Sequence, residues 1–75
     1  MTGTLKQARL AKHITQKSIA SAVGIGDQHY QAIEYGKVEP SVVLAIRIAE
    51  VLSVYDYTEF KALFPPRKQD HKNNA

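Results

Sequence analysis

The sequence has no cysteine, no tryptophan and no long apolar run. The lack of cysteine excludes disulfides and thiolate metal sites, and the three histidines (His13, His29 and His71) have no ligand-like spacing. We therefore expect neither a metal nor a cofactor. No apolar stretch approaches the ~18 residues of a membrane span, and the amino terminus lacks the hydrophobic block of a signal peptide. These absences predict a soluble, cytoplasmic protein that does not bind a membrane.

Sequence signatures of catalysis are also missing. The chain has no glycine-rich phosphate-binding loop, no Ser/His/Asp order and no pair of carboxylates in a plausible cleft, so we expect neither an enzyme nor a small-molecule substrate. The net charge of +3 permits an anionic partner without requiring one. Two of these charges come from the last nine residues, which contain Arg67, Lys68 and Lys72 against Asp70. The remainder of the chain is nearly neutral, so any nucleic-acid binding depends on where its charges lie.

The chain is organised around residues 16–36, which are predicted to form two short helices joined by a tight turn. Gly24 can adopt the left-handed conformation that ends a helix, and Ile25 can fold back on the core as the contact that accompanies such an end. The expected inner face of this helix pair is apolar and consists of Ile19, Ala20, Val23, Ile25, Tyr30 and Ile33. A short turn containing glycine between two helices is the helix-turn-helix pattern, which presents its second helix to the major groove of DNA.

Local end signals predict five helices and no strand. The expected helices cover residues 4–12, 16–23, 27–35, 42–52 and 57–64. Their expected N-caps are Thr4, Thr15, Gly26 or Asp27, Ser41 and Asp56, and His13 is expected in a left-handed conformation after the first helix. The fourth helix should bury Val42, Ala45, Ile48, Ala49 and Leu52. Tyr55 and Phe60 are expected to form a hydrophobic staple at the start of the fifth helix. The predicted fold class is a compact all-α domain.

The polar carboxyl-terminal segment is predicted to lie outside this domain. Pro65 and Pro66 stop the fifth helix, and the nine residues that follow, RKQDHKNNA, contain no large apolar side chain. We therefore expect a folded domain over residues 1–66 and a disordered tail over residues 67–75.

The joint spacing of several short motifs resembles the Cro/CI-type helix-turn-helix regulators of phage and mobile elements, also called the XRE family. The likeness covers residues 5–60 and rests on Thr15-Gln16, Ala20, Val23-Gly24-Ile25-Gly26, Ile33-Glu34-Tyr35-Gly36-Lys37, Pro40-Ser41, Ile48-Ala49 and Leu52-Ser53-Val54. It implies a five-helix, lambda-repressor-like fold whose third helix reads DNA. The sequence departs from the family at His13, where glycine is common, at Gly26, where a serine or threonine cap is usual, and at Asp27 and Ala32, where amide or basic side chains are frequent.

Candidate DNA-binding residues follow from the predicted faces of the third helix and from its flanks. Base edges are expected to meet Asp27, Gln28, Gln31 and Ala32, with Gln28 the strongest candidate because its amide can bond adenine in two places. Solvated polar faces remain the alternative for Gln28 and Gln31, and helix capping for Asp27. Phosphates are expected to meet Gln16, Lys17, Tyr35, Gly36 and Lys37, with the side-chain grip of Gln16 implied by the resemblance.

Two further predictions concern stability and assembly. The resemblance implies an ion pair between Arg9 and Glu34 that ties the third helix to the first. The fifth helix carries more apolar surface than a small core needs, which suggests a homodimer interface formed by Tyr57, Phe60, Leu63 and Phe64.

These features together predict a sequence-specific regulator of double-stranded DNA. The expected mode of action is repression, with the third helix, residues 27–35, inserted into the major groove of a palindromic operator by each copy of a dimer. The alternative left open by the sequence is an antitoxin or adaptor that uses the same fold mainly to bind a protein.

Overall fold

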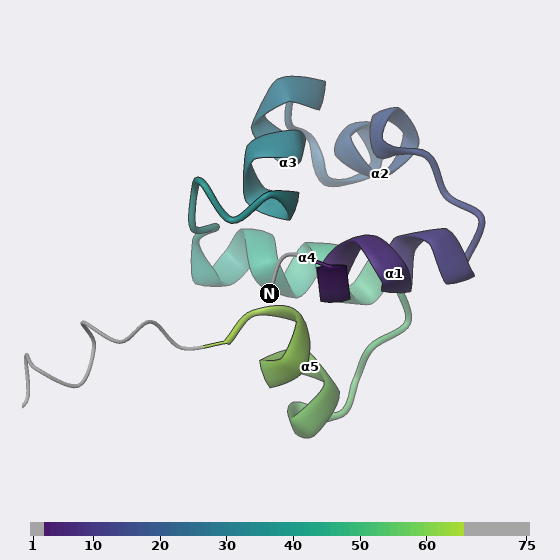
Figure 1. Cartoon of the computed structure of the whole chain (residues 1–75), viewed down its shortest axis with the longest axis vertical. Helices are drawn as coiled ribbons and strands as arrows, with labels where there is room; N and C mark the ends of the chain where they lie inside the picture. Colours follow the sequence, from purple (N-terminus) through teal and green to yellow (C-terminus); the bar gives the residue numbers. More distant parts are fainter. Residues whose placement is uncertain (1–2, 66–75) are drawn as a thin grey trace, which may run out of the picture.

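The computed structural model describes residues 3–65, and within this range the chain forms five α-helices and no strand (Figure 1). The helices are α1 (Gly3–Ala11), α2 (Gln16–Val23), α3 (Asp27–Glu34), α4 (Val42–Val51) and α5 (Tyr57–Leu63). The predicted all-α, five-helix fold is therefore confirmed. The predicted tail over residues 67–75 lies outside the described residues.

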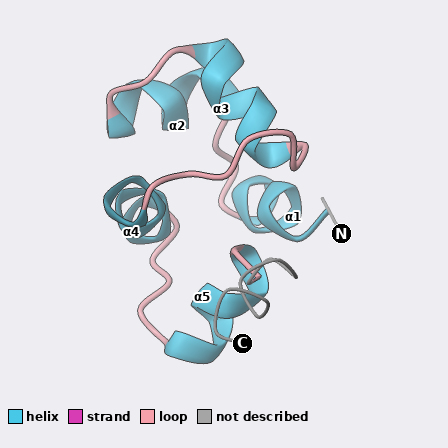
Figure 2. Ribbon diagram, turned by 90° about the vertical axis from the view of Figure 1, so that its left-hand side faces the viewer, coloured by secondary structure: helices cyan, strands magenta, loops and turns pink. Residues whose placement is uncertain are grey.

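The helices form three tiers. Figures 1 and 2 both show α2 and α3 at one end of the molecule, α1 and α4 across the middle, and α5 at the other end. Tyr30, Ile19 and Ile48 are fully buried where α2, α3 and α4 meet, and they form the centre of the core. This arrangement places the predicted recognition helix, α3, directly on a packed core. It also separates α3 from α5 by the whole middle tier.

Three helices begin at a side chain that accepts a hydrogen bond from the first turn. Thr15 accepts from the backbone amide of Ser18, Ser41 from that of Leu44, and Asp56 from that of Glu59, as predicted. The N-cap of α3 is Gly26, which has no side chain to offer and leaves the first turn without such a bond.

The first four helices end in the same way. One or two positions after the last helical residue, each of these ends has a left-handed residue, with φ of +60° at His13, +82° at Gly24, +83° at Gly36 and +59° at Ser53. At each of these four ends, two backbone amides return to the carbonyls of the last turn in the pattern of a Schellman motif. At α2, for example, the amide of Gly24 donates to Ser21 and the amide of Ile25 donates to Ala20. The left-handed conformation predicted for His13 is confirmed.

Several details of the predicted helices are wrong. Thr4 lies inside α1 and does not cap it, because the helix begins at Gly3. Val42, predicted to be buried, is 74% exposed at the first position of α4. Tyr55 is 79% exposed and forms no staple with Phe60. Within residues 3–65, no helix is long and apolar enough to cross a membrane.

Candidate nucleic-acid interface

The α3 helix has one face in the core and the opposite face open. Its inner side consists of Tyr30, Ile33 and Glu34, all of which are buried. On the outer side, Asp27 and Gln28 are exposed, and Gln31 and Ala32, one turn further on, are half-buried. These four residues are the predicted base-contacting set. They share one side of the helix because residues three and four apart are neighbours on a helix surface.

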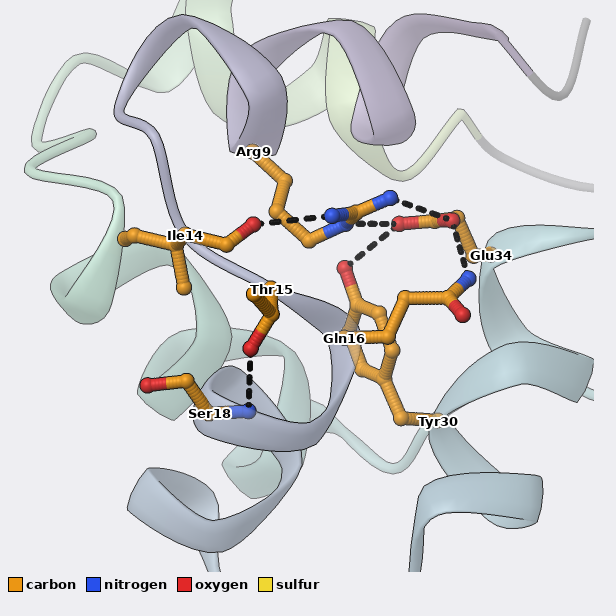
Figure 3. A network of polar contacts seen from close by, with 7 residues as sticks. All are labelled: Arg9, Ile14, Thr15, Gln16, Ser18, Tyr30 and Glu34. Atoms are coloured by element: carbon orange, nitrogen blue, oxygen red, sulfur yellow. Dashed lines mark hydrogen bonds and ion pairs between the residues drawn. The ribbon is translucent and has the colours of Figure 1, made fainter.

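The buried end of α3 is fixed by a network of hydrogen bonds centred on the carboxylate of Glu34 (Figure 3). Arg9 of α1 donates to it through Nε at 2.7 Å and through a terminal nitrogen at 3.3 Å, forming the expected ion pair. Gln16 at the start of α2 donates from Nε2 at 2.7 Å, and the hydroxyl of Tyr30 donates at 3.0 Å. The second terminal nitrogen of Arg9 donates to the carbonyl of Ile14 at 2.8 Å. One carboxylate thereby ties α1, α2 and α3 together.

The contacts of this network shift the ionisation of its members. Burial on its own raises the pKa of Glu34, but the hydrogen bonds from Arg9, Gln16 and Tyr30 outweigh it and hold the pKa below its ordinary value. The hydrogen bond to Glu34 raises the pKa of Arg9. Burial, together with the neighbouring carboxylate, raises the pKa of Tyr30, so its hydroxyl stays protonated and donates. The network therefore contains one anion, one cation and two neutral donors at neutral pH.

The contacts made by Gln16 and Tyr30 were not foreseen. The prediction assigned Gln16 to a phosphate and Tyr30 to the apolar core, whereas both side chains donate to Glu34. The spacing of Tyr30 and Glu34, four residues apart on one helix, was the available signal for their bond. No comparable signal exists for Gln16, because its distance from Glu34 depends on how α2 and α3 pack.

The start of α2 offers backbone donors to an anion. Among the described residues no acceptor bonds the amides of Gln16 and Lys17, whereas the amides of Ser18 and Ile19 are bonded to Thr15. The Lys17 side chain is exposed beside them. Because free amides and the helix dipole favour a negative charge at this end, the arrangement suits a phosphate.

The predicted backbone contribution of Gly36 and Lys37 to phosphate binding is wrong. The amide of Gly36 donates to Ile33 at 3.1 Å and that of Lys37 donates to Ala32 at 2.9 Å, because both amides close the end of α3. What remains available here are side chains. Lys37 is exposed, and Tyr35 is 53% exposed at the same end of the helix.

The predicted dimer residues of α5 are divided between the core and the surface. Leu63 and Phe64 are half-buried against the core, and the ring of Phe64 lies 5.2 Å from that of Phe60, centroid to centroid. Tyr57 is exposed, with the ammonium of Lys61 4.9 Å from the centre of its ring. Much of the apolar surface predicted for an interface therefore stabilises the single chain.

The described part of the chain contains no group of three or more histidine, aspartate or glutamate side chains arranged to hold a metal ion.

Comparisons with known proteins agree with this arrangement. The family described as "Helix-turn-helix" matches residues 5–60. The chain is 43% identical over 56 residues to YqaF of Bacillus subtilis, named an uncharacterized HTH-type transcriptional regulator, covering 75% of this chain and 72% of the relative. It is 39% identical over 54 residues to a protein with the same description, MJ0272 of Methanocaldococcus jannaschii, covering 72% of this chain and 82% of the relative. No solved structure gives a significant match. The chain belongs to the Cro/CI-type (XRE) helix-turn-helix family, whose members are DNA-binding transcriptional regulators and not enzymes.

Proposed function

We propose that the protein is a sequence-specific repressor that inserts α3 into the major groove of a palindromic operator as a homodimer. Occupancy of the operator blocks a promoter sterically, and the protein acts in the cytoplasm. The observation that carries this proposal is the combination of an open outer face on α3 with an inner face fixed to two other helices through Glu34. A recognition helix held in this way meets DNA without first having to be ordered.

The outer face of α3 offers chemistry for reading bases. The exposed amide of Gln28 can donate to and accept from adenine at once, which discriminates against a wrong base by about 1–3 kcal/mol. Gln31 lies one turn further along, and Ala32 can contact a thymine methyl group. Asp27 can accept from cytosine N4, although as the first residue of α3 it also suits the helix dipole.

Phosphate binding is assigned to the two flanks of this face. On one side, the DNA phosphates contact the free backbone amides of Gln16 and Lys17 and the ammonium of Lys17. On the other side, the DNA phosphates contact the ammonium of Lys37 and the hydroxyl of Tyr35. The Gln16 side chain acts by locking the start of α2 to Glu34. The second N–H of its amide remains available to a phosphate.

The test is selection of bound sequences from random duplexes, performed with the full chain and with Gln28→Ala. We expect a palindromic motif with half-sites about one helical turn apart, and a loss of preference at one position per half-site in the variant. The matched control is Gln7→Ala, which removes an exposed amide from α1 and should leave the motif unchanged.

Two outcomes of this selection contradict the proposal. Binding without any motif and without strong salt dependence would rule out a sequence-specific regulator. A motif that Gln28→Ala leaves intact would show that another residue reads the bases. A reporter gene placed behind the selected site separates repression from activation, since repression requires expression to fall when the protein is present.

A further inference from the structure

Three of the exposed large apolar residues lie together on α4, whereas α1 exposes Leu10 alone. Val42, Val43 and Ile46, which we call the α4 patch, are 74%, 62% and 45% exposed. The opposite side of the same helix buries Ala45, Ile48 and Ala49 in the core. Figure 2 shows α4 at one side of the molecule, seen end-on, with α1 on its inner side, α2 above it and no helix beyond it on the outer side.

The α4 patch is contiguous. Val43 and Ile46 are three residues apart, Val42 and Ile46 are four apart, and residues at these spacings are neighbours on a helix surface. Single exposed apolar residues are common, but a contiguous group of them marks a contact surface. Residues 66–75, which follow the described part of the chain, contain no large apolar side chain that could cover it.

We propose that the α4 patch is where a second copy of this chain docks, with the two α4 helices antiparallel. The proposal rests on the proposed function, because a palindromic operator requires both α3 helices to face the same side of one duplex. The two-fold axis must then run along the direction from α5 to α3. Figure 1 shows that α4 lies across this direction. Rotation by a half-turn about an axis perpendicular to a helix reverses that helix, so contact through α4 makes the pair antiparallel.

Antiparallel pairing makes the α4 surface complementary to itself. With the axis between Val43 and Ile46, Val43 of each copy lies opposite Ile46 of the other. Val42 lies opposite Arg47 of the second copy, whose aliphatic stem can cover it while the guanidinium stays in water. The apolar and aliphatic parts of the surface thus find matching parts.

The α5 surface is less suited to this role. Leu63 and Phe64 pack against the core of their own chain, and α5 lies at the end of the molecule opposite α3. Two copies joined end to end through α5 would carry their recognition helices at opposite ends of the dimer. Such a dimer cannot place both helices on one operator.

The first test compares two matched double variants by sedimentation equilibrium without DNA. Val43→Lys with Ile46→Lys adds two positive charges to the α4 patch, and Tyr55→Lys with Tyr57→Lys adds the same charge to positions before and in α5 that are more exposed still. We expect the dimer dissociation constant to rise at least tenfold for the α4 variant and less than twofold for the α5 variant. Circular dichroism verifies that both variants are folded, which the exposure of all four positions favours.

The second test uses the absence of cysteine from the chain. Ile46→Cys and Tyr57→Cys are treated with a short bifunctional thiol reagent, both free and bound to an operator-length duplex. We expect covalent dimers from Ile46→Cys and none from Tyr57→Cys.

The α4 proposal is overturned if Tyr57→Cys cross-links and Ile46→Cys does not, or if only the α5 variant dissociates the dimer. It is also overturned if the unsubstituted chain is a monomer both free and bound to the duplex. Because the sedimentation measurement contains no DNA, it separates failure of this interface from failure of DNA binding.

Discussion

At the scale of single residues, the molecule depends most on Glu34. This carboxylate is 2% exposed, yet four donors from three side chains satisfy it, and no buried side-chain nitrogen or oxygen in the described part of the chain lacks a hydrogen bond. A buried charge is tolerated only when it is paired in this way. Removing one member of the pair is costly because it leaves the other charge buried and uncompensated.

Substitution Glu34→Gln should therefore destabilise the fold by about 3–5 kcal/mol, because the Arg9 guanidinium loses its counter-ion. Urea denaturation at pH 7 measures the change. The control is Glu59→Gln, which neutralises an exposed carboxylate in the first turn of α5 and should cost less than about 1 kcal/mol. Equal effects of the two substitutions would show that the ion pair contributes nothing particular.

The stability contribution of Glu34 should also depend on pH. The folded-state pKa of Glu34 lies below the ordinary value of 4.5, so in acid the unfolded state binds the proton more readily than the native state does. The contribution of Glu34 is complete above the unfolded pKa and is lost as the pH falls through the native pKa. The difference in unfolding free energy between the unsubstituted chain and Glu34→Gln should be constant from pH 8 to about pH 6 and shrink below about pH 4.5. A difference that stays constant down to pH 3 would contradict the pairing.

Tyr30 offers a second residue-scale prediction. Its ring is fully buried and its hydroxyl donates to Glu34, so Tyr30→Phe keeps the packing and removes one of the four hydrogen bonds. We expect a loss of about 1.5–3 kcal/mol in unfolding free energy, as for a hydrogen bond to a charged group. Tyr55→Phe, the same change at an exposed ring, should have no measurable effect. Indistinguishable thermal midpoints for the two variants would show that the hydrogen bond from Tyr30 to Glu34 does not stabilise the fold.

At the scale of helices, the sequence predicted most of what local chemistry decides. Thr15, Ser41 and Asp56 cap because their side chains bond backbone amides three residues on, and Gly24 ends α2 because glycine tolerates a left-handed conformation. The left-handed conformation of Ser53 after α4 was not foreseen. Serine has no strong preference for that region, so the Schellman bonds of the surrounding turn select it.

The errors and omissions concern contacts between helices. Val42 fits the apolar periodicity of α4 but is exposed. Its exposure depends on how the other helices pack around α4, and a pattern within one helix carries no information about that packing. Tyr55 precedes a valid capping sequence, yet no contact forms because its side chain turns to solvent. The bond from Gln16 to Glu34 joins residues 18 apart and arises only once α2 and α3 have packed. For the candidate site, the sequence thus indicated which residues belong to α3 and its flanks but not how Gln16 is used.

The two glycines of the turn between α2 and α3 should respond in opposite ways to one substitution. A Cβ added at Gly26 or at Gly24 meets no atom within 4 Å, so space does not distinguish them. Gly26 has φ of −74° as the N-cap of α3, and Gly26→Ser supplies the missing cap, for a gain of about 0.5–1 kcal/mol. Gly24 has φ of +82°, and Gly24→Ser should cost about 1 kcal/mol or more. Thermal unfolding measures both, and a shift of the same sign would show that these backbone angles do not control the turn.

At the scale of the whole molecule, the proposed functional surfaces lie on different tiers. The α2–α3 end carries the proposed DNA-binding face, the outer side of α4 carries the proposed contact with a second copy, and α5 packs under the middle tier at the far end (Figures 1 and 2). The four residues proposed to meet bases include no cation. Attraction to DNA must then come from the cations beside them, and it doubles when two copies bind one duplex.

This arrangement predicts how salt dependence responds to substitution. Lys37→Gln should weaken binding about equally for all sequences, and it should reduce the slope of log K against log salt by about 1 for each copy bound, or about 2 for a dimer. Gln28→Ala should weaken binding to the preferred site and leave the slope unchanged, because it removes a base contact and no charge. Lys61→Gln removes an exposed cation from α5, at the end remote from α3, and serves as the control. Fluorescence anisotropy over a range of salt concentrations measures all three. If Lys61→Gln changes the slope as much as Lys37→Gln, the attraction is spread over the molecule and the α2–α3 end is not the DNA-binding face.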